Sequence, residues 1–357
     1  VVVIANQVLS LSLMFWMNLR HFGTSRSFDV VPITTITHIT WIVVNLAVIE
    51  FVWRRTNSTL DMLNLLNDIY RKCSQVDLSR KTVKWITKIP WLLCLLSILW
   101  YMLDVAIISR DSNDKSPWGM RKSIIDGAYS EYLNLRNFNF SNAEEYNSIK
   151  NNLIGAIYIV QIFYLDGLTR CCYMACVCGG FAFWLTMNAF LNHIQLQDVH
   201  KRLPEVLGIL DQFQQALNHA SDSLGLLYLM ICVAFLPYYC LTLPVLFGGH
   251  VLRIIEVAFQ LTLLGLAVFP AAHVHSKMKS IVPLIQMSYT GADATFLSSE
   301  INMRANIAIQ NLHANTYGLS GKFFVITYGF IGNICGLIVT FAVILSNVTF
   351  KVYDFKP

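Results

Sequence analysis

The chain of 357 residues closes with an apolar run that begins after Lys322 and carries no charged side chain up to Val348. As a helix rising 1.5 Å per residue, residues 323–348 would extend about 39 Å, more than the roughly 30 Å hydrocarbon core of a bilayer. Gly329, Gly332 and Gly336 lie three and four positions apart, so they share a face that another helix can approach closely. The run therefore predicts a membrane-spanning helix that packs against a partner.

The composition places the rest of the chain in the same environment. Hydrophobic residues make up 55% of the chain and charged residues only 13%, whereas soluble domains carry about 25% charged residues. The apolar runs are therefore counted as membrane spans of a multi-pass protein rather than as buried cores. The formal net charge of +5 is spread thinly, which excludes a basic block suited to nucleic acid.

Seven apolar segments predict an all-α membrane protein with seven transmembrane helices. Residues 1–274 hold helices one to six, residues 275–321 form a cytosolic helical anchor segment, and residues 322–357 form the seventh helix with a short outer tail. The first six spans are expected at 1–19, 35–53, 86–108, 151–197, 223–247 and 251–274. The fourth would be about 70 Å long as one helix, so it should project well beyond the bilayer.

The segments between the spans also carry helical patterns. Residues 54–85 and 191–222 are expected to be cytosolic and amphipathic, with apolar residues recurring at helical spacing. The expected apolar stripes consist of Leu60, Leu63, Leu66 and Ile69, and of Leu207, Leu210, Phe213 and Leu217. The cytosolic helices after spans four and six, in residues 191–222 and 275–321, are expected to form a region of contact between subunits.

The charges at the ends of the spans indicate the orientation. Arg54, Arg55, Lys84 and Lys88 lie next to the second and third spans, so the positive-inside rule favours a cytoplasmic N-terminus. The sequon at Asn139 agrees, because it falls in the loop 109–150, which this orientation places outside, where glycosylation occurs. Seven spans then put the C-terminus outside, the reverse of a G-protein-coupled receptor.

The end of the seventh span carries a resemblance to a known family. The nine residues from Thr340 to Val348 read TFAVILSNV and resemble the terminal signature of insect gustatory receptors, which is Thr-Tyr, five hydrophobic residues and Gln-Phe. The odorant co-receptor ends similarly, and the run 320–324 resembles the family's approach to its last helix. Phe341, Asn347 and Val348 depart from the signature, and Ser346 places a polar residue in its hydrophobic run.

The resemblance implies a pore shared between subunits. A single seven-span chain with one weakly polar last helix has no ion path of its own, and symmetric oligomers solve this by placing one helix per subunit round an axis. In the family that the chain resembles, four subunits form a cation channel lined by the last helix. A ring of Ile344 would then gate by dewetting and Asn347 would add an uncharged polar ring. The expected pore and gate residues are Thr340, Phe341, Ile344, Asn347 and Val348.

A ligand pocket is expected in the outer halves of spans two to six, where the family binds its ligands. Aromatic, carboxylate and amide side chains recur there at helical spacing, which suits a small hydroxyl-bearing molecule, and sugars are one such class. Membrane anchoring by Trp and Tyr is the alternative for each single residue. The expected pocket residues are His38, Trp41, Trp100, Asp104, Tyr158, Gln161, Tyr238, Tyr239, Thr242, Glu256 and Gln260.

No enzyme constellation is present in the sequence. It contains no His-x-x-x-His pair with a carboxylate, no Gly-x-Ser-x-Gly and no phosphate-binding loop. Cys171, Cys172, Cys176 and Cys178 fall within an apolar run, and on one helix only Cys172 and Cys176 face the same way, so packing is favoured over a metal site with four converging ligands. Neither cofactor nor metal is expected.

The sequence therefore predicts a ligand-gated, non-selective cation channel subunit that acts as a taste receptor. Its expected partners are a small-molecule tastant, permeating cations, membrane lipid and three further copies in a homotetramer, with a heteromer as the alternative. The expected location is the plasma membrane of a sensory dendrite. An odorant receptor or co-receptor subunit is the alternative within the family. Outside it, a transporter would show paired broken helices and an inverted repeat, and a membrane scaffold would make the pocket residues incidental.

Overall fold

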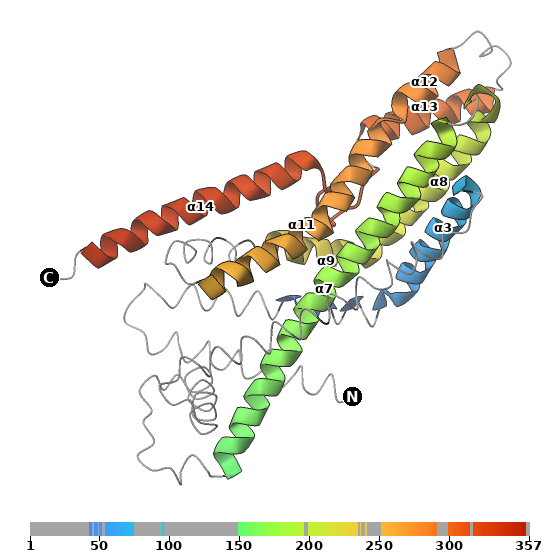
Figure 1. The fold of residues 1–357 in the computed structure, drawn as a ribbon. Helices are drawn as coiled ribbons and strands as arrows, with labels where there is room; N and C mark the ends of the chain where they lie inside the picture. Colours follow the sequence, from blue (N-terminus) through green and yellow to red (C-terminus); the bar gives the residue numbers. More distant parts are fainter. Residues whose placement is uncertain are drawn as a thin grey trace. The chain divides into compact units, whose positions relative to one another are not determined.

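The computed structural model describes the chain in several stretches, drawn as coloured ribbon in Figure 1. The regular elements in these stretches are helices, so the described part of the chain is all-α, as predicted. Most of the first three expected spans lies outside the description. The described residues are 43–44, 46–48, 50–51, 54–74, 95, 149–195, 199–234, 236, 240, 251–290, 299–314 and 317–354.

The chain divides into two units. One comprises Val1–Asn45 with Trp91–Arg170, and the other comprises Leu46–Pro90 with Cys171–Pro357. Helix α7 (Ile149–Gln195) runs from the first unit into the second. It is 47 residues long, which is about 70 Å at a rise of 1.5 Å per residue. The prediction that this segment forms one continuous helix is therefore confirmed for its backbone.

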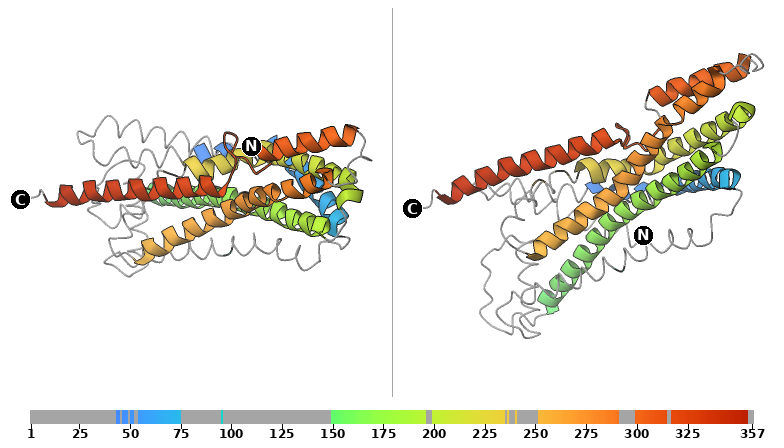
Figure 2. Two further views of the ribbon diagram at one scale, coloured as in Figure 1. Left: turned by 90° about the horizontal axis from the view of Figure 1, so that it is seen from above. Right: turned by 45° about the horizontal axis from the view of Figure 1, so that its top comes forward.

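The second unit is built on two amphipathic helices packed side by side. Helices α3 (Thr56–Ser74) and α8 (Val199–Ser223) lie along one another in the views of Figure 2. The predicted stripe of α8 is confirmed, because all four of its residues are buried. The predicted stripe of α3 is partly wrong: Leu60 and Leu63 are exposed, and the buried residues are Met62, Leu66, Ile69 and Cys73. Their spacing of four, three and four follows the 3.6-residue turn, whereas steps of three drift round the helix.

The chain bends sharply where α8 ends. Helix α9 (Gly225–Leu229) follows after Leu224, and the axis turns by 61° between Leu203–Ser223 and Gly225–Val233. A π-helical turn, η1 (Met230–Ala234), continues it. The amphipathic helix thus passes into the apolar segment predicted as the fifth span, and it does so through a kink that periodicity alone does not reveal.

Helices α11, α12 and α13 come next among the described residues. Helix α11 (Val251–Lys279) continues five residues beyond the expected end of the sixth span, and α12 (Val282–Thr290) and α13 (Ser299–His313) lie in the expected anchor segment. Helix α12 packs against both α13 and α8 (Figure 1). The helical character predicted for residues 275–321 is thus present in the described residues.

Some of these helices are apolar enough to cross a membrane. Among the described residues, Cys172–Ile194 and Val257–Met287 meet the length and hydropathy expected of a span, and the bent pair at Leu224 would be a third. The shorter Tyr328–Ile344 is also apolar. Each overlaps a predicted span, but Val257–Met287 extends 13 residues beyond the predicted end of the sixth span at residue 274, into the segment predicted to be cytosolic. The remaining expected spans stay predictions.

The packing of α3 on α8 predicts an unreactive thiol. Burial raises the pKa of Cys73 to about 12, with a smaller contribution from the negative charge of Glu205. At pH 8 the reactive thiolate should then be about a thousandfold scarcer than in an ordinary cysteine. Alkylation of Cys73, followed by mass spectrometry, should be slow in the folded protein and fast in urea. Equal rates in both states would show that α3 does not pack on α8.

Candidate functional site

The seventh helix, α14 (Tyr328–Asp354), begins six residues after the predicted start at Lys322. Lys322 has a φ of 70°, in the left-handed region where a helix cannot continue. Beside it, the Gly321 amide donates to the Phe324 carbonyl at 2.8 Å. Thr327 then caps the helix, accepting a hydrogen bond from the Phe330 amide at 3.0 Å. Residues 317–327, here called the strap, therefore form a turn rather than the first turns of the helix.

The beginning of the strap is fixed by buried polar contacts. His275 Nδ1 lies 2.9 Å from the Tyr317 carbonyl oxygen, and the Tyr317 hydroxyl donates to Gln214 Oε1 at 3.1 Å. Tyr317 is 2% exposed. Burial, and secondarily the charge of Asp211, raises the pKa of its hydroxyl to about 12, so the side chain stays a neutral donor at physiological pH.

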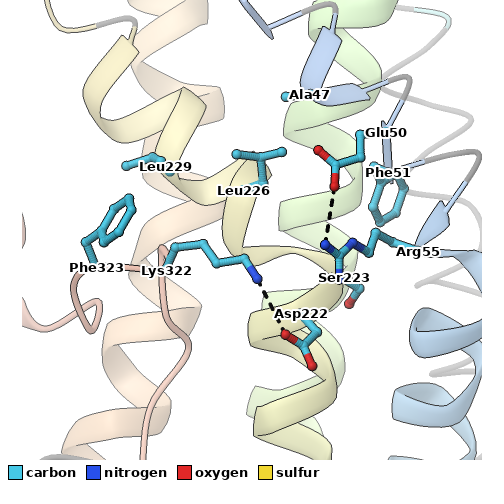
Figure 3. A pocket seen from close by; sticks show the side chains of 10 residues that line it. All are labelled: Ala47, Glu50, Phe51, Arg55, Asp222, Ser223, Leu226, Leu229, Lys322 and Phe323. Carbon is cyan, nitrogen blue, oxygen red and sulfur yellow. Dashed lines mark hydrogen bonds and ion pairs between the residues drawn. The ribbon is translucent and has the colours of Figure 1, made fainter.

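The middle of the strap lies directly on the bend between α8 and α9. A Cβ atom added to Gly225 would stand 3.2 Å from the Ser320 carbonyl oxygen and 3.4 Å from the Lys322 backbone nitrogen. Beside this contact, Lys322 Nζ lies 3.4 Å from Asp222 Oδ1 (Figure 3). The glycine therefore permits a close approach of two backbones, and the ion pair lies at its edge.

Helix α8 connects the strap to two other elements. Its Asp211 pairs with Arg304 of α13, in addition to the contacts of Gln214 and Asp222 with the strap. Along the side that faces α3, its residues contact Ser58 and Lys72: Ser58 Oγ donates to the His219 carbonyl at 3.2 Å, and Lys72 Nζ donates to Gln212 at 3.0 Å. Helix α8 thus contacts the strap, α13 and α3.

The described residues of the predicted pore lie on exposed surface of α14. Phe341 is 48% exposed, Ile344 is 50% exposed, and Thr340 is exposed with its hydroxyl bonded to the Gly336 carbonyl. A Cβ atom at Gly332 or Gly336 would meet nothing within 4 Å. In the described part of a single chain this apolar face is therefore open, as is the surface at Leu337, Val339 and Val343, whereas Ile338 and Ala342 are buried. Asn347 and Val348 continue the helix, and their side chains lie outside the description.

Most of the predicted ligand residues lie outside the described part of the chain. Gln260 is half-buried on α11, while Tyr158, Gln161 and Glu256 are placed only as backbone positions of α7 and α11. The pocket and the glycosylation at Asn139 stay predictions. The residues outside the description are His38, Trp41, Trp100, Asp104, Asn139, Tyr238, Tyr239 and Thr242.

Two cysteines of α7 take up packing positions. Cys172 and Cys176 are fully buried, and Cys172 Sγ donates to the Leu227 carbonyl of α9 at 3.7 Å. Tyr228, also buried, donates to the Cys176 carbonyl at 2.8 Å. No group of three or more His, Cys, Asp or Glu that could hold a metal occurs among the described residues. The Cys172 thiol and the Cys176 backbone carbonyl therefore connect α7 to α9.

Two cavities contain residues that the sequence did not single out as sites. One, of about 690 Å³, is lined by α7, α11 and Tyr328, and there His273 Nδ1 lies 3.0 Å from the Tyr328 hydroxyl. The other, of about 260 Å³, contains Asp222 and Lys322. Each cavity brings together residues more than 50 positions apart, so no local sequence pattern predicts either cavity. The one relevant feature of the sequence is that Lys322 is the last charged residue before an apolar run.

Comparisons with known proteins give a likeness of fold. No family model matches the sequence, and no curated protein matches it. Among solved structures, the insect olfactory receptor OR5 from Machilis hrabei superimposes with a TM-score of 0.59 at 13% sequence identity. The match covers 96% of this chain and 88% of the receptor chain. The chain thus has the fold of an insect olfactory receptor along nearly its whole length.

Proposed function

We propose that the chain is one subunit of a ligand-gated cation channel in which four copies of α14 surround the pore. The observation that supports this most is the open apolar face of α14, where Thr340, Phe341 and Ile344 are exposed. Large exposed apolar faces call for a partner or for lipid. The fold shared with an insect olfactory receptor agrees with a chemosensory channel. The proposal places the chain in the plasma membrane as a multi-pass protein with its N-terminus inside.

The ligand class has two candidates. The terminal sequence TFAVILSNV and the carboxylates and amides of the expected pocket favour a tastant with hydroxyl groups. One solved structure with this fold is an olfactory receptor, which favours a volatile, more apolar ligand. Both candidates share the same pore and the same strap, and they differ only in the pocket.

Whole-cell recording with two ligand panels tests the proposed function. Cells expressing the chain should give inward cation current with members of a sugar and polyol panel, or with members of a volatile organic panel for the second candidate. Cells expressing no receptor are the control. Current from the volatile panel alone would reject the taste assignment. A chain that reaches the cell surface and transports a ligand without channel current would instead be a transporter.

Asn347→Asp should change which ions permeate. In a tetramer it would place four carboxylates round one axis, and their mutual repulsion should raise their pKa values. The charged ring should favour divalent cations and show block by them. Ser346→Ala is the matched control, because position 346 lies about 100° from 347 round the helix. Bi-ionic reversal potentials provide the measurement; unchanged permeability ratios in Asn347→Asp would remove this residue from the pore.

A further inference from the structure

A small charged cavity lies where the segment before α3, the α8–α9 bend and the strap meet (Figure 3). Its volume is about 260 Å³, below the roughly 300–1,000 Å³ of pockets that enclose a drug-sized ligand, so it suits a compact polar group. Its lining includes four charged residues, Glu50, Arg55, Asp222 and Lys322, beside Leu226 and Leu229.

Two cations and two carboxylates line this cavity, so its formal charge is zero. Arg55 Nη2 lies 3.2 Å from Glu50 Oε1, and Lys322 Nζ lies 3.4 Å from Asp222 Oδ1. Figure 3 shows Arg55 and Lys322 extending into the cavity from opposite sides. The four side chains are 30–62% exposed, and exposed ion pairs contribute only about 0–1 kcal/mol each. A ligand carrying both charges can therefore replace these pairs at little cost.

The cavity adjoins apolar surface. Leu226 and Leu229 line it from α9, and the 26 residues that follow Lys322 carry no charge. Phe323, beside Lys322, is 87% exposed. Charged side chains next to an exposed aromatic ring at the end of an apolar segment are typical of the boundary between membrane and water.

We propose that this cavity binds the headgroup of a zwitterionic phospholipid. The phosphate would lie between Arg55 and Lys322, and the ammonium group would face Glu50 and Asp222. Phe323, beside Leu226 and Leu229, would contact the glycerol and the first methylenes of the acyl chains. A lipid with a net negative charge fits less well, because both carboxylates would remain beside it without a cation. The proposal rests on the membrane location given above, and the lipid would join the segment before α3 to the strap.

Lipid titration of the purified full chain, delipidated in detergent and followed by native mass spectrometry, tests the proposal. Dioleoylphosphatidylcholine should bind at least about tenfold more tightly than dioleoylphosphatidylglycerol, and inorganic phosphate should not bind. The double variant Arg55→Gln/Lys322→Gln should bind phosphatidylcholine about tenfold more weakly, since it loses two exposed ion pairs of up to about 1 kcal/mol each. Lys72→Gln/Arg304→Gln removes the same charge elsewhere and should bind as the wild type does.

Three results would overturn the proposal: equal binding of the two lipids, tighter binding of phosphatidylglycerol, or no difference between the two double variants. If the first double variant does not fold, Phe323→Ser serves in its place, because so exposed a side chain contributes little to folding. It should weaken phosphatidylcholine binding, and unchanged binding would count against the site. None of these measurements depends on ion conduction. If the chain selects phosphatidylcholine but conducts no ions, the lipid site stands and only the proposed channel function is rejected.

Discussion

Ile344→Ser should produce a cation current in the absence of ligand. Ile344 lies on the open face of α14 and is 50% exposed. In a tetramer the substitution appears four times round one axis, so an apolar constriction that excludes water would become polar and fill with water. Whole-cell recording at rest should show a standing current well above that of the wild type, and one that added ligand increases little.

Val339→Ser is the matched control for this substitution. Val339 lies on the same helix and is 55% exposed, but it is about 140° away from Ile344 round the helix axis. It should leave the resting current unchanged, because it does not face the same axis. A silent Ile344→Ser channel at normal surface expression, or a leak equal to that of Val339→Ser, would mean that this face of α14 does not line the pore.

Gly225→Leu should abolish the response to ligand while leaving the pore intact. A side chain at position 225 meets the Ser320 carbonyl oxygen and the Lys322 backbone, and backbone atoms cannot move aside as the tip of a side chain can. Overpacking of this kind costs about 1–3 kcal/mol. The strap should therefore move off the α8–α9 bend. Ligand-evoked current measures the loss.

Two controls separate a failure of coupling from a failure to fold. Gly208→Leu makes the same chemical change on α8, where an added Cβ meets nothing within 4 Å, and it should leave the response intact and favour the helix slightly. In the background of Ile344→Ser, Gly225→Leu should still leak, since the gate itself is altered. If Gly225→Leu responds to ligand as the wild type does, the contact between strap and bend does not couple ligand binding to the pore.

Long periodic segments could be predicted from the sequence because each depends only on its own residues. Helix α7 follows from its long apolar run, and the buried stripe of α8 follows from hydrophobic spacing. The start of α14 could not be predicted, because Lys322 adopts a positive φ and the turn depends on contacts with His275 and Gly225 far away in the chain. The expected stripe of α3 is partly wrong because steps of three residues through Leu60 and Leu63 drift round the helix, away from the side that packs on α8.

The same distinction applies to the candidate site, where residues on one helix could be predicted and residues brought together by tertiary contacts could not. Thr340 and Ile344 could be placed on one face by counting residues, and their exposure agrees with that face being open in one chain. The cavity that contains Asp222 and Lys322 could not be predicted, because its charges come from three separate segments. Residues on one helix recur at a spacing that can be recognised in the sequence. Residues that act through tertiary contacts have no such spacing, so they cannot be predicted in this way.

The most direct test is a planar-bilayer recording of purified Ile344→Ser, because this variant needs no identified ligand. If four chains surround a pore lined by α14, the protein should give discrete single-channel steps carried by cations, and native mass spectrometry of the same sample should give the mass of four subunits. Purified Val339→Ser should be silent. A folded Ile344→Ser protein that gives no steps, or one that conducts as a monomer, would contradict the proposed channel.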